Sequence, residues 1–303
     1  MTPTPYRHEA LPYKGQNDFL ASCAALVADG RAEDEPIMFL ASAAKLDNLR
    51  DVLGSDSADV TLVATDEHGQ NPARIATLLH SFQAGQDGRH CVGVNESVFP
   101  GRSDAVLAEA HLAETILNSS HLQSWPMSIV CLYDAERLAD TELEQMRRSH
   151  PVVRGEGTND SYEPELAAEL FAAPLDEPTG RVEARVIGPG ELAELRAFVR
   201  GSAAQAGLAE DRLDDLILAA NEVGTNSLSY GGADCRVALW RTDESVVCEL
   251  RDPGRIVDPL AGRLAPPPTA TTGRGLWLAN HLCDLVQIRS SQDGTVVRLF
   301  VER

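Results

Sequence analysis

The stretch "LAANEVGTNSLSYGG", residues 218–232, decides the fold of the C-terminal part of this 303-residue chain. Apolar residues around it recur at the i, i+3, i+4 spacing of a buried helix face, and two glycines end the pattern. On a neighbouring stripe, Glu222 and Asn226 lie four residues apart, so both side chains leave the same side of the helix one turn apart. A solvated helix edge is the commoner reason for such a stripe, and a functional site is the other. The sequence downstream decides between these two explanations.

Two turns that contain glycine follow this helix. In "ELRDPG" a strand-like run ends at Asp252, whose carboxylate can accept a hydrogen bond from an amine, and Gly254 would let a ligand approach the backbone. In "TTGRGLWLANHL" Gly273 and Gly275 precede an apolar helix, whose first N–H groups favour an anion. Each turn alone is ordinary loop sequence. Together with the polar stripe, the two turns predict a ligand site.

The other elements of the second half are short strands and helices with clear periodicity. Residues 181–187 alternate like a half-buried strand, helices are expected at about 190–206, 210–230 and 275–282, and two hairpins are expected from 235–241 with 245–251 and from 285–291 with 295–301. Antiparallel hairpins with grouped helices predict an α+β two-layer sandwich, one layer of sheet and one of helix.

The first half alternates short apolar runs with helical patterns. Strands are expected at 37–42, 59–65, 89–96 and 127–134, and helices at about 16–29, 43–53, 72–85, 102–118 and 139–148. This alternation predicts a doubly wound α/β domain with a parallel sheet. The first of these strands runs into "ASAAKLDN" (41–48), which lacks the glycines of a phosphate-binding P-loop.

Composition separates the two halves. Residues 155–178 hold seven acidic residues, three prolines and no Lys or Arg, which predicts a linker over 155–180 between domains at 6–154 and 181–303. Residues 1–180 carry 12 Lys and Arg against 29 Asp and Glu, whereas residues 181–303 carry 14 against 17. The acidic excess of the first half argues against nucleic acid as its partner.

The sequence also favours a cytoplasmic protein. The N-terminus has no apolar signal segment, and no run approaches the 18 apolar residues of a membrane span. The cysteines at 23, 91, 131, 235, 248 and 283 have neither C-x-x-C nor paired Cys/His spacing, and most lie in apolar surroundings. They therefore suggest buried small side chains in a reducing compartment rather than a disulfide framework.

In their order and spacing, the three C-terminal motifs resemble the GHKL ATPase superfamily, the Bergerat fold of gyrase, MutL and histidine-kinase catalytic domains. The resemblance covers roughly residues 181–303. It implies that ATP binds with Mg²⁺, that Glu222 is the catalytic residue that activates the nucleophile, and that Asn226 holds the metal. The ATP-binding residues implied are Asn226, Asp252, Gly254, Gly273, Arg274, Gly275, Leu276 and Thr295.

Two positions depart from the superfamily pattern. Ile256 stands where the first glycine box usually has a second glycine, and Tyr230 stands where the superfamily often has a histidine. The expected lid, about residues 257–272, is short and rich in Pro and Thr. These departures bear on lid closure and turnover rather than on adenine binding.

The compact C-terminal half looks most like the RsbW-type anti-sigma factor kinases, which phosphorylate a serine of a STAS-type anti-anti-sigma protein. This resemblance implies a ligand-responsive serine/threonine kinase in signal transduction that phosphorylates or sequesters a transcription-regulatory partner: a sigma factor, a STAS protein, or both. Two alternatives stay open: a non-catalytic switch that binds ATP or a sigma factor, and an orphan sensor histidine kinase. A homodimer is one expected assembly.

The first half is similar to the MEDS sensory domain, over about residues 6–151. The resemblance rests on "YRHEALPYKGQNDFLASCAALVADG" (6–30), "NPARI" (71–75), "PGRSDAVLAEAHLAETILN" (100–118) and "SIVCLYD" (128–134). It implies a RecA-like α/β fold without a P-loop that responds to a small molecule. The candidate residues for this ligand are His8, Glu96 and Arg102, and for His8 a structural role is the more common alternative.

Overall fold

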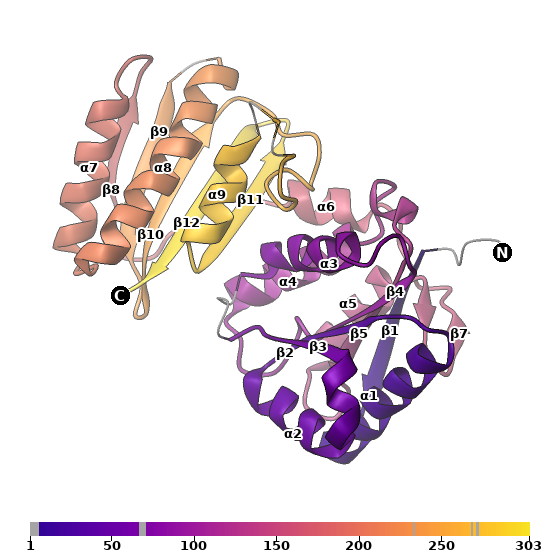
Figure 1. Ribbon diagram of the computed structural model, residues 1–303. Helices are drawn as coiled ribbons and strands as arrows, with labels where there is room; N and C mark the ends of the chain where they lie inside the picture. Colours follow the sequence, from indigo (N-terminus) through magenta and orange to yellow (C-terminus); the bar gives the residue numbers. More distant parts are fainter. Residues whose placement is uncertain (1–5, 67–70, 233, 268, 271–272) are drawn as a thin grey trace. The chain divides into compact units, whose positions relative to one another are not determined.

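The chain forms two compact units in a computed structural model that describes residues 6–66, 71–232, 234–267, 269–270 and 273–303 (Figure 1). One unit spans Met1–Ala167 and the other Ala168–Arg303, so the division falls inside the predicted acidic linker. The short helix α6 (Leu166–Ala172) crosses the division. Each unit is described by itself below.

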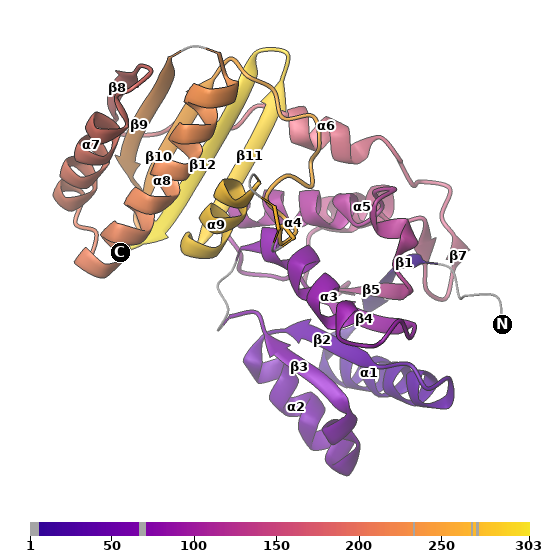
Figure 2. The same ribbon diagram turned by 45° about the horizontal axis from the view of Figure 1, so that its top comes forward.

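The N-terminal unit is a mostly parallel sheet with helices on both faces, as the alternating pattern predicts (Figures 1 and 2). The strand order is β3-β2-β4-β5-β1-β6-β7. The strands are β1 (Arg7–Tyr13), β2 (Ile37–Ala41), β3 (Val60–Ala64), β4 (Cys91–Asn95), β5 (Met127–Asp134), β6 (Val152–Val153) and β7 (Gly157–Thr158). The helices are α1 (Gly15–Ala32), α2 (Ala43–Leu53), α3 (Ile75–Ala84), α4 (Asp104–Ile116) and α5 (Asp140–Ser149), with 3₁₀ turns η1 (Gly54–Asp59), η2 (Pro72–Arg74) and η3 (Leu122–Ser124).

Strand β1 is the main element that the sequence pattern missed. It lies inside the sheet, parallel to both β5 and β6, although it contains a proline. The proline fits because β6 pairs only with Glu9 and Ala10, so no partner strand lies beside Pro12 on the side to which its nitrogen points. The first strand is therefore followed by Lys14 and Gly15 and not by residues 41–48, and this turn also lacks the glycines of a P-loop.

The two faces of this sheet carry different side chains. One face packs Tyr13, Phe39, Val94, Val130 and Leu132 against apolar residues of α1 and α2, and this is the main hydrophobic core. The opposite face carries His8, Gly93, Asn95 and Cys131 beneath α3, α4 and α5. Polar side chains therefore concentrate on one buried face of the unit.

The C-terminal unit is a two-layer sandwich with its helices on one face of the sheet, as predicted (Figure 1). The strand order is β11-β12-β10-β9-β8, and every neighbouring pair is antiparallel. The strands are β8 (Glu183–Ile187), β9 (Cys235–Arg241), β10 (Ser245–Asp252), β11 (Leu285–Ser291) and β12 (Gly294–Glu302), and the helices are α7 (Leu192–Gln205), α8 (Glu210–Tyr230) and α9 (Arg274–Leu282).

The second face of this sheet is covered by chain from the linker. Arg298 donates a hydrogen bond to the carbonyl oxygen of Asp176, and Arg251 lies 3.9 Å from the carboxylate of Glu177. A cavity of about 600 Å³ lies between residues 172–177 and the sheet. Residues 172–177 are therefore part of the C-terminal unit and not a free spacer.

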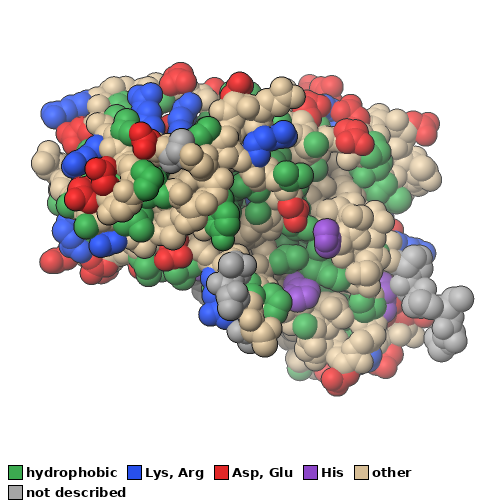
Figure 3. All heavy atoms as spheres, turned by 90° about the horizontal axis from the view of Figure 1, so that it is seen from above, with side chains coloured by type: hydrophobic (Ala, Val, Ile, Leu, Met, Phe, Trp, Pro, Cys, Tyr) green, Lys and Arg blue, Asp and Glu red, His purple; other side chains and the backbone are tan. Residues whose placement is uncertain are grey.

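Charged side chains of both signs are visible on the face drawn in Figure 3. On the face drawn in Figure 3, Lys and Arg are interspersed with Asp and Glu rather than gathered into one basic patch. Among the described residues, no helix is both long enough and apolar enough to cross a membrane.

Helices α7 and α8 approach each other closely at Gly224. A Cβ atom placed there would lie 2.4 Å from Leu195 Cδ2, inside a fully buried contact. We expect Gly224→Val to destabilise the unit by about 1–3 kcal/mol through overpacking. The control is Gly201→Ala on α7, where no atom lies within 4 Å; it is expected to stabilise the unit by about 0.5–1 kcal/mol. Urea unfolding of both variants measures this, and equal shifts of the same sign would contradict it.

Candidate functional site

The polar stripe of α8 lies against the start of α9. Glu222 and Asn226 are half-buried, and neither has a hydrogen-bond or ion-pair partner among the described residues. A Cβ atom on Gly275 would lie 3.1 Å from both Glu222 Oε2 and Asn226 Nδ2. The second glycine turn therefore faces both residues of the stripe, and the stripe is not a solvated helix edge.

The first glycine turn is held by hydrogen bonds of Asp252 at the end of β10. Its Oδ1 accepts from the backbone N–H of Gly254 at 2.8 Å, and its Oδ2 accepts from the Ser227 hydroxyl at 2.6 Å. A Cβ atom on Gly254 would lie 2.8 Å from both Asp252 Oδ1 and the Cα of Gly231. The turn therefore packs directly on the C-terminal end of α8, and only glycine fits there.

Thr295 belongs to the same group of residues. It pairs with Asp252 between β12 and β10, and its hydroxyl donates to the carbonyl oxygen of Gly254 at 2.9 Å. The Ser290 hydroxyl lies 3.0 Å from the Thr295 hydroxyl and also accepts from the N–H of Ile256 at 2.9 Å. Strand pairing thus brings the predicted position 295 beside the predicted position 252, 43 residues earlier in the chain.

Helix α9 begins after a glycine. Gly273 is the N-cap residue, has a φ of 85° in the left-handed region that favours glycine, and offers no side chain to cap the helix. Arg274 and Gly275 are the first two helical residues, and Leu276 packs against Gly262, whose added Cβ would lie 2.6 Å from that of Leu276. Gly275, in the first turn of α9, lies on the side of Glu222 and Asn226, and the first turn of a helix favours an anion.

The positions that depart from the superfamily pattern lie around these turns. Ile256 is half-buried and bonded through its backbone to Ser290, and the Tyr230 side chain is 73% exposed. Of the expected lid, positions 268, 271 and 272 lie outside the described residues. Its first part contacts α9, because the Asn280 side chain donates to the carbonyl oxygen of Gly262 at 3.0 Å.

The three sensory candidates do not meet in one cleft. His8 lies under α4 on one face of the N-terminal sheet, in contact with Asn118 and Cys131. Glu96 belongs to the α1 face instead, because it accepts a hydrogen bond from Tyr13, a residue of the core on that face, at 2.5 Å. Sequence position alone could not separate the two faces, since the strand that carries His8 was not predicted.

Arg102 stands apart from His8 as well. Its guanidinium stacks on the Phe99 ring at 4.3 Å, and Nε and Nη1 are buried with no hydrogen-bond partner among the described residues. Burial lowers the pKa of Arg102 to about 10, although the charge of Glu96 opposes this shift. Glu96 also pairs with Lys45, which donates to the Tyr13 hydroxyl at 2.7 Å.

Comparison with known proteins agrees with both units. Residues 188–301 match the histidine kinase-like ATPase domain, and residues 7–151 match the MEDS domain, the methanogen/methylotroph DcmR sensory domain. None of the curated proteins matches the sequence. Among solved structures, the RsbU and RsbW domains of Rv1364c from Mycobacterium tuberculosis match at 19% identity and a TM-score of 0.32, over 41% of this chain and 33% of that one.

The fold and the site together define the class: a GHKL-type ATPase domain joined to an α/β sensory domain. Residues 188–301 are a histidine kinase-like ATPase domain, and residues 7–151 are a MEDS sensory domain. The match to Rv1364c spans a third of that chain.

Proposed function

We propose that the C-terminal unit binds ATP with Mg²⁺ and that the chain is a ligand-responsive serine/threonine kinase acting on a transcription-regulatory partner. The observation that carries the proposal is the contact of Gly275 with both Glu222 and Asn226. It brings the N-terminus of α9, a feature that favours anions, beside a carboxylate and a carboxamide that have no hydrogen-bond or ion-pair partner among the described residues.

Asp252 has the capacity to recognise adenine. An ionised carboxylate offers about four lone-pair positions, and only two are used, by Gly254 and Ser227. The remaining positions can accept the exocyclic amine of adenine. Thr295 supports this role because it fixes the carbonyl of Gly254 and thereby the turn against which the base would lie.

Asn226 is suited to bind the Mg²⁺ ion, and Glu222 is suited to activate the hydroxyl that accepts the phosphoryl group. The Asn226 side-chain oxygen is the type of ligand that Mg²⁺ takes, and the ion would neutralise charge on the phosphates. Glu222 lies one turn earlier on the same face of α8, so its carboxylate can orient the attacking hydroxyl and accept its proton. As the new oxygen–phosphorus bond forms, the bond to the bridging oxygen of ATP breaks and ADP leaves.

The proposed acceptor is a serine or threonine of a STAS-type protein, with a sigma factor as a second partner that the domain sequesters. The MEDS domain would bind the small-molecule signal that controls this activity. Residues 155–180 would connect the two domains, with residues 172–177 already held on the C-terminal sheet. The proposed bounds are residues 6–154 for the sensory domain and residues 181–303 for the ATP-binding domain. The proposed location of the protein is the cytoplasm.

A non-catalytic switch is the second candidate, and Ile256 favours it. Its side chain stands where the superfamily keeps a glycine, next to the turn that carries Asp252. Such a protein would bind ATP or a sigma factor without transferring phosphate. Glu222 favours catalysis, because a switch that only binds ATP does not need a carboxylate close to the phosphates, where its charge opposes binding.

The proposal predicts that a fragment of residues 168–303 binds ATP. This fragment is one compact unit and keeps the contacts of Asp176 and Glu177 with the sheet. We expect saturable, Mg²⁺-dependent heat in calorimetry below about 1 mM ATP, the usual range of substrate affinities. The control is residues 1–167, the other compact unit, which should fold alone and show no change in melting temperature with ATP. Absence of saturation in the C-terminal fragment would remove the nucleotide assignment.

A further inference from the structure

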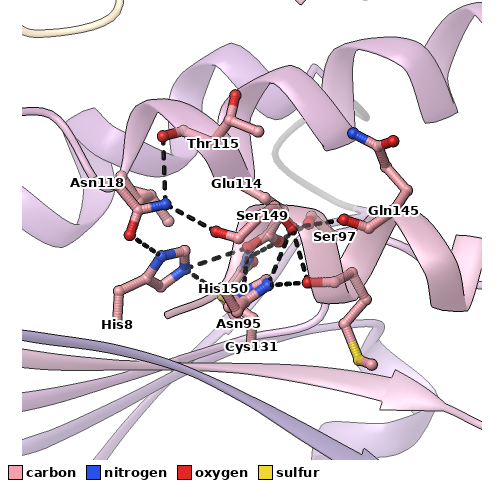
Figure 4. Close-up of polar contacts among 12 residues, drawn as sticks. His8, Asn95, Ser97, Glu114, Thr115, Asn118, Cys131, Gln145, Ser149 and His150 are labelled. Carbon is pink, nitrogen blue, oxygen red and sulfur yellow. Dashed lines mark hydrogen bonds and ion pairs between the residues drawn. The ribbon is translucent and has the colours of Figure 1, made fainter. Parts of the chain in front are cut away.

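Four metal-ligating side chains meet inside the N-terminal unit, whereas the proposed ATP site belongs to the C-terminal unit. They are His8 of β1, Glu114 of α4, Cys131 of β5 and His150, which follows α5 (Figure 4). Their ligand atoms all lie within 4.8 Å of one another, and each residue is at most 2% exposed. Together the four residues are called the His₂-Cys-Glu cluster below.

The parallel pairing of β1 and β5 creates half of this cluster. His8 pairs with Ile129, and Cys131 follows two residues later, so both side chains point to the face covered by α4 and α5. His8 Nε2 lies 3.2 Å from Cys131 Sγ. Glu114 enters from α4 above, and its Oε2 lies 3.5 Å from Nε2 of both His8 and His150.

These distances match the edges of a tetrahedral zinc site. Zinc bonds of about 2.0–2.3 Å place neighbouring nitrogen, oxygen and sulfur ligands roughly 3.3–3.6 Å apart. Three of the six separations in the cluster, 3.2, 3.5 and 3.5 Å, already lie near these values, and none exceeds 4.8 Å. Little movement is needed for the four atoms to surround one ion.

The hydrogen bonds behind the histidines orient them as ligands. His150 Nδ1 lies 2.9 Å from the carbonyl oxygen of Met146, which can only accept, so this nitrogen carries the proton. His8 Nδ1 lies 3.0 Å from Asn118 Oδ1, while the amide nitrogen of Asn118 donates to the carbonyl oxygen of Ser149. With the Nδ1 proton fixed in this way, the lone pair of Nε2 points into the cluster when each ring is neutral, as in metal sites whose histidines are held from behind.

Glu114 also points a carboxylate oxygen, Oε2, at the Nε2 atoms of the two histidines. Its Oε1 accepts hydrogen bonds from Asn95 and Ser97, whereas Oε2 has no hydrogen-bond donor among the described residues. A buried carboxylate facing two neutral imidazoles is costly unless a cation lies between them.

We propose that His8, Glu114, Cys131 and His150 bind one zinc ion in the sensory domain. Two imidazoles, a thiolate and a carboxylate are ligands that zinc accepts, and four protein ligands with no access to solvent describe a closed, structural site. The thiol proton of Cys131 leaves when the ion binds. The ion would tie two strands of the sheet to α4 and to the end of α5.

Metal analysis of the full chain tests the site. We expect one equivalent of zinc after purification without chelators, and, after removal of zinc, one equivalent of Co²⁺ with a thiolate-to-cobalt charge-transfer band. Cys131→Ser should remove this band and Glu114→Gln should weaken metal retention by at least about tenfold. The matched control is Cys23→Ser, a thiol equally buried on the opposite face of the sheet, which should keep both the metal and the band.

Two outcomes would overturn the proposal. One is a metal-free full chain that keeps its circular dichroism and melting temperature yet takes up no Co²⁺, which would leave the cluster as a hydrogen-bonded network with a protonated histidine. The other is an unchanged charge-transfer band in Cys131→Ser. If the variants fail to fold, the cobalt titration of the unmodified chain decides. ATP binding by residues 168–303 is measured separately, so the two proposals stand or fall independently.

Discussion

Replacing Glu222 with Gln is expected to lower phosphoryl transfer to a STAS-type partner by roughly 10²–10⁴-fold, the usual contribution of a positioned general base. Gln keeps the size and hydrogen-bonding capacity of the side chain but cannot take the proton of an attacking hydroxyl. The variant should fold normally, because Glu222 has no hydrogen-bond or ion-pair partner among the described residues. The measurement is single-turnover transfer from labelled ATP.

ATP affinity separates this role from simple binding. Removing a negative charge near the phosphates should leave affinity within a few-fold or raise it slightly. The control is Glu194→Gln, the same change at an exposed position of α7, which should alter neither transfer nor affinity. Transfer at the unmodified rate in Glu222→Gln would exclude the general-base role. No transfer by the unmodified chain to any STAS protein would favour the non-catalytic switch.

Much of the fold follows from local periodicity. The helix that carries Glu222 and Asn226, both C-terminal hairpins and four strands of the parallel sheet are confirmed close to their predicted bounds. Strand β1 escaped because "RHEALPY" contains charged residues and a proline, which disfavour an interior strand. Its pairing with β5 is a long-range contact. No local sequence pattern shows that β6 pairs only with Glu9 and Ala10 and leaves the position beside Pro12 without a partner strand.

The two candidate sites differ in how many of their residues could be predicted from the sequence. Apart from Thr295, the residues of the proposed ATP site lie in three ordered motifs, so their grouping was predictable, whereas the hydrogen bond of Ser227 to Asp252 depends on how α8 packs on β10. The His₂-Cys-Glu cluster has no spacing signal, because its members come from β1, α4, β5 and the residue after α5, spread between residues 8 and 150. Of these residues only His8 was singled out, and its partners became visible once β1 joined the sheet.

The second large effect is expected for Asn226→Ala, which should abolish the Mg²⁺-dependent part of ATP binding. Loss of a contact to a charged group costs about 1.5–3 kcal/mol, so affinity in the presence of Mg²⁺ should fall by roughly 10–100-fold. Affinity without Mg²⁺ should change little, because Asp252 and the start of α9 are untouched. Calorimetry with and without Mg²⁺ gives both values.

Stability distinguishes a metal ligand from a structural amide at position 226. Asn226 has no hydrogen-bond partner among the described residues, so truncation should leave the melting temperature nearly unchanged. The matched control is Asn221→Ala on the same helix, which removes a hydrogen bond from Arg196 at the surface and should leave Mg²⁺-dependent binding intact. A fall in melting temperature with binding retained in Asn226→Ala would make the amide structural. Equal binding losses in both variants would point to α8 as a whole rather than to a metal ligand one turn from Glu222.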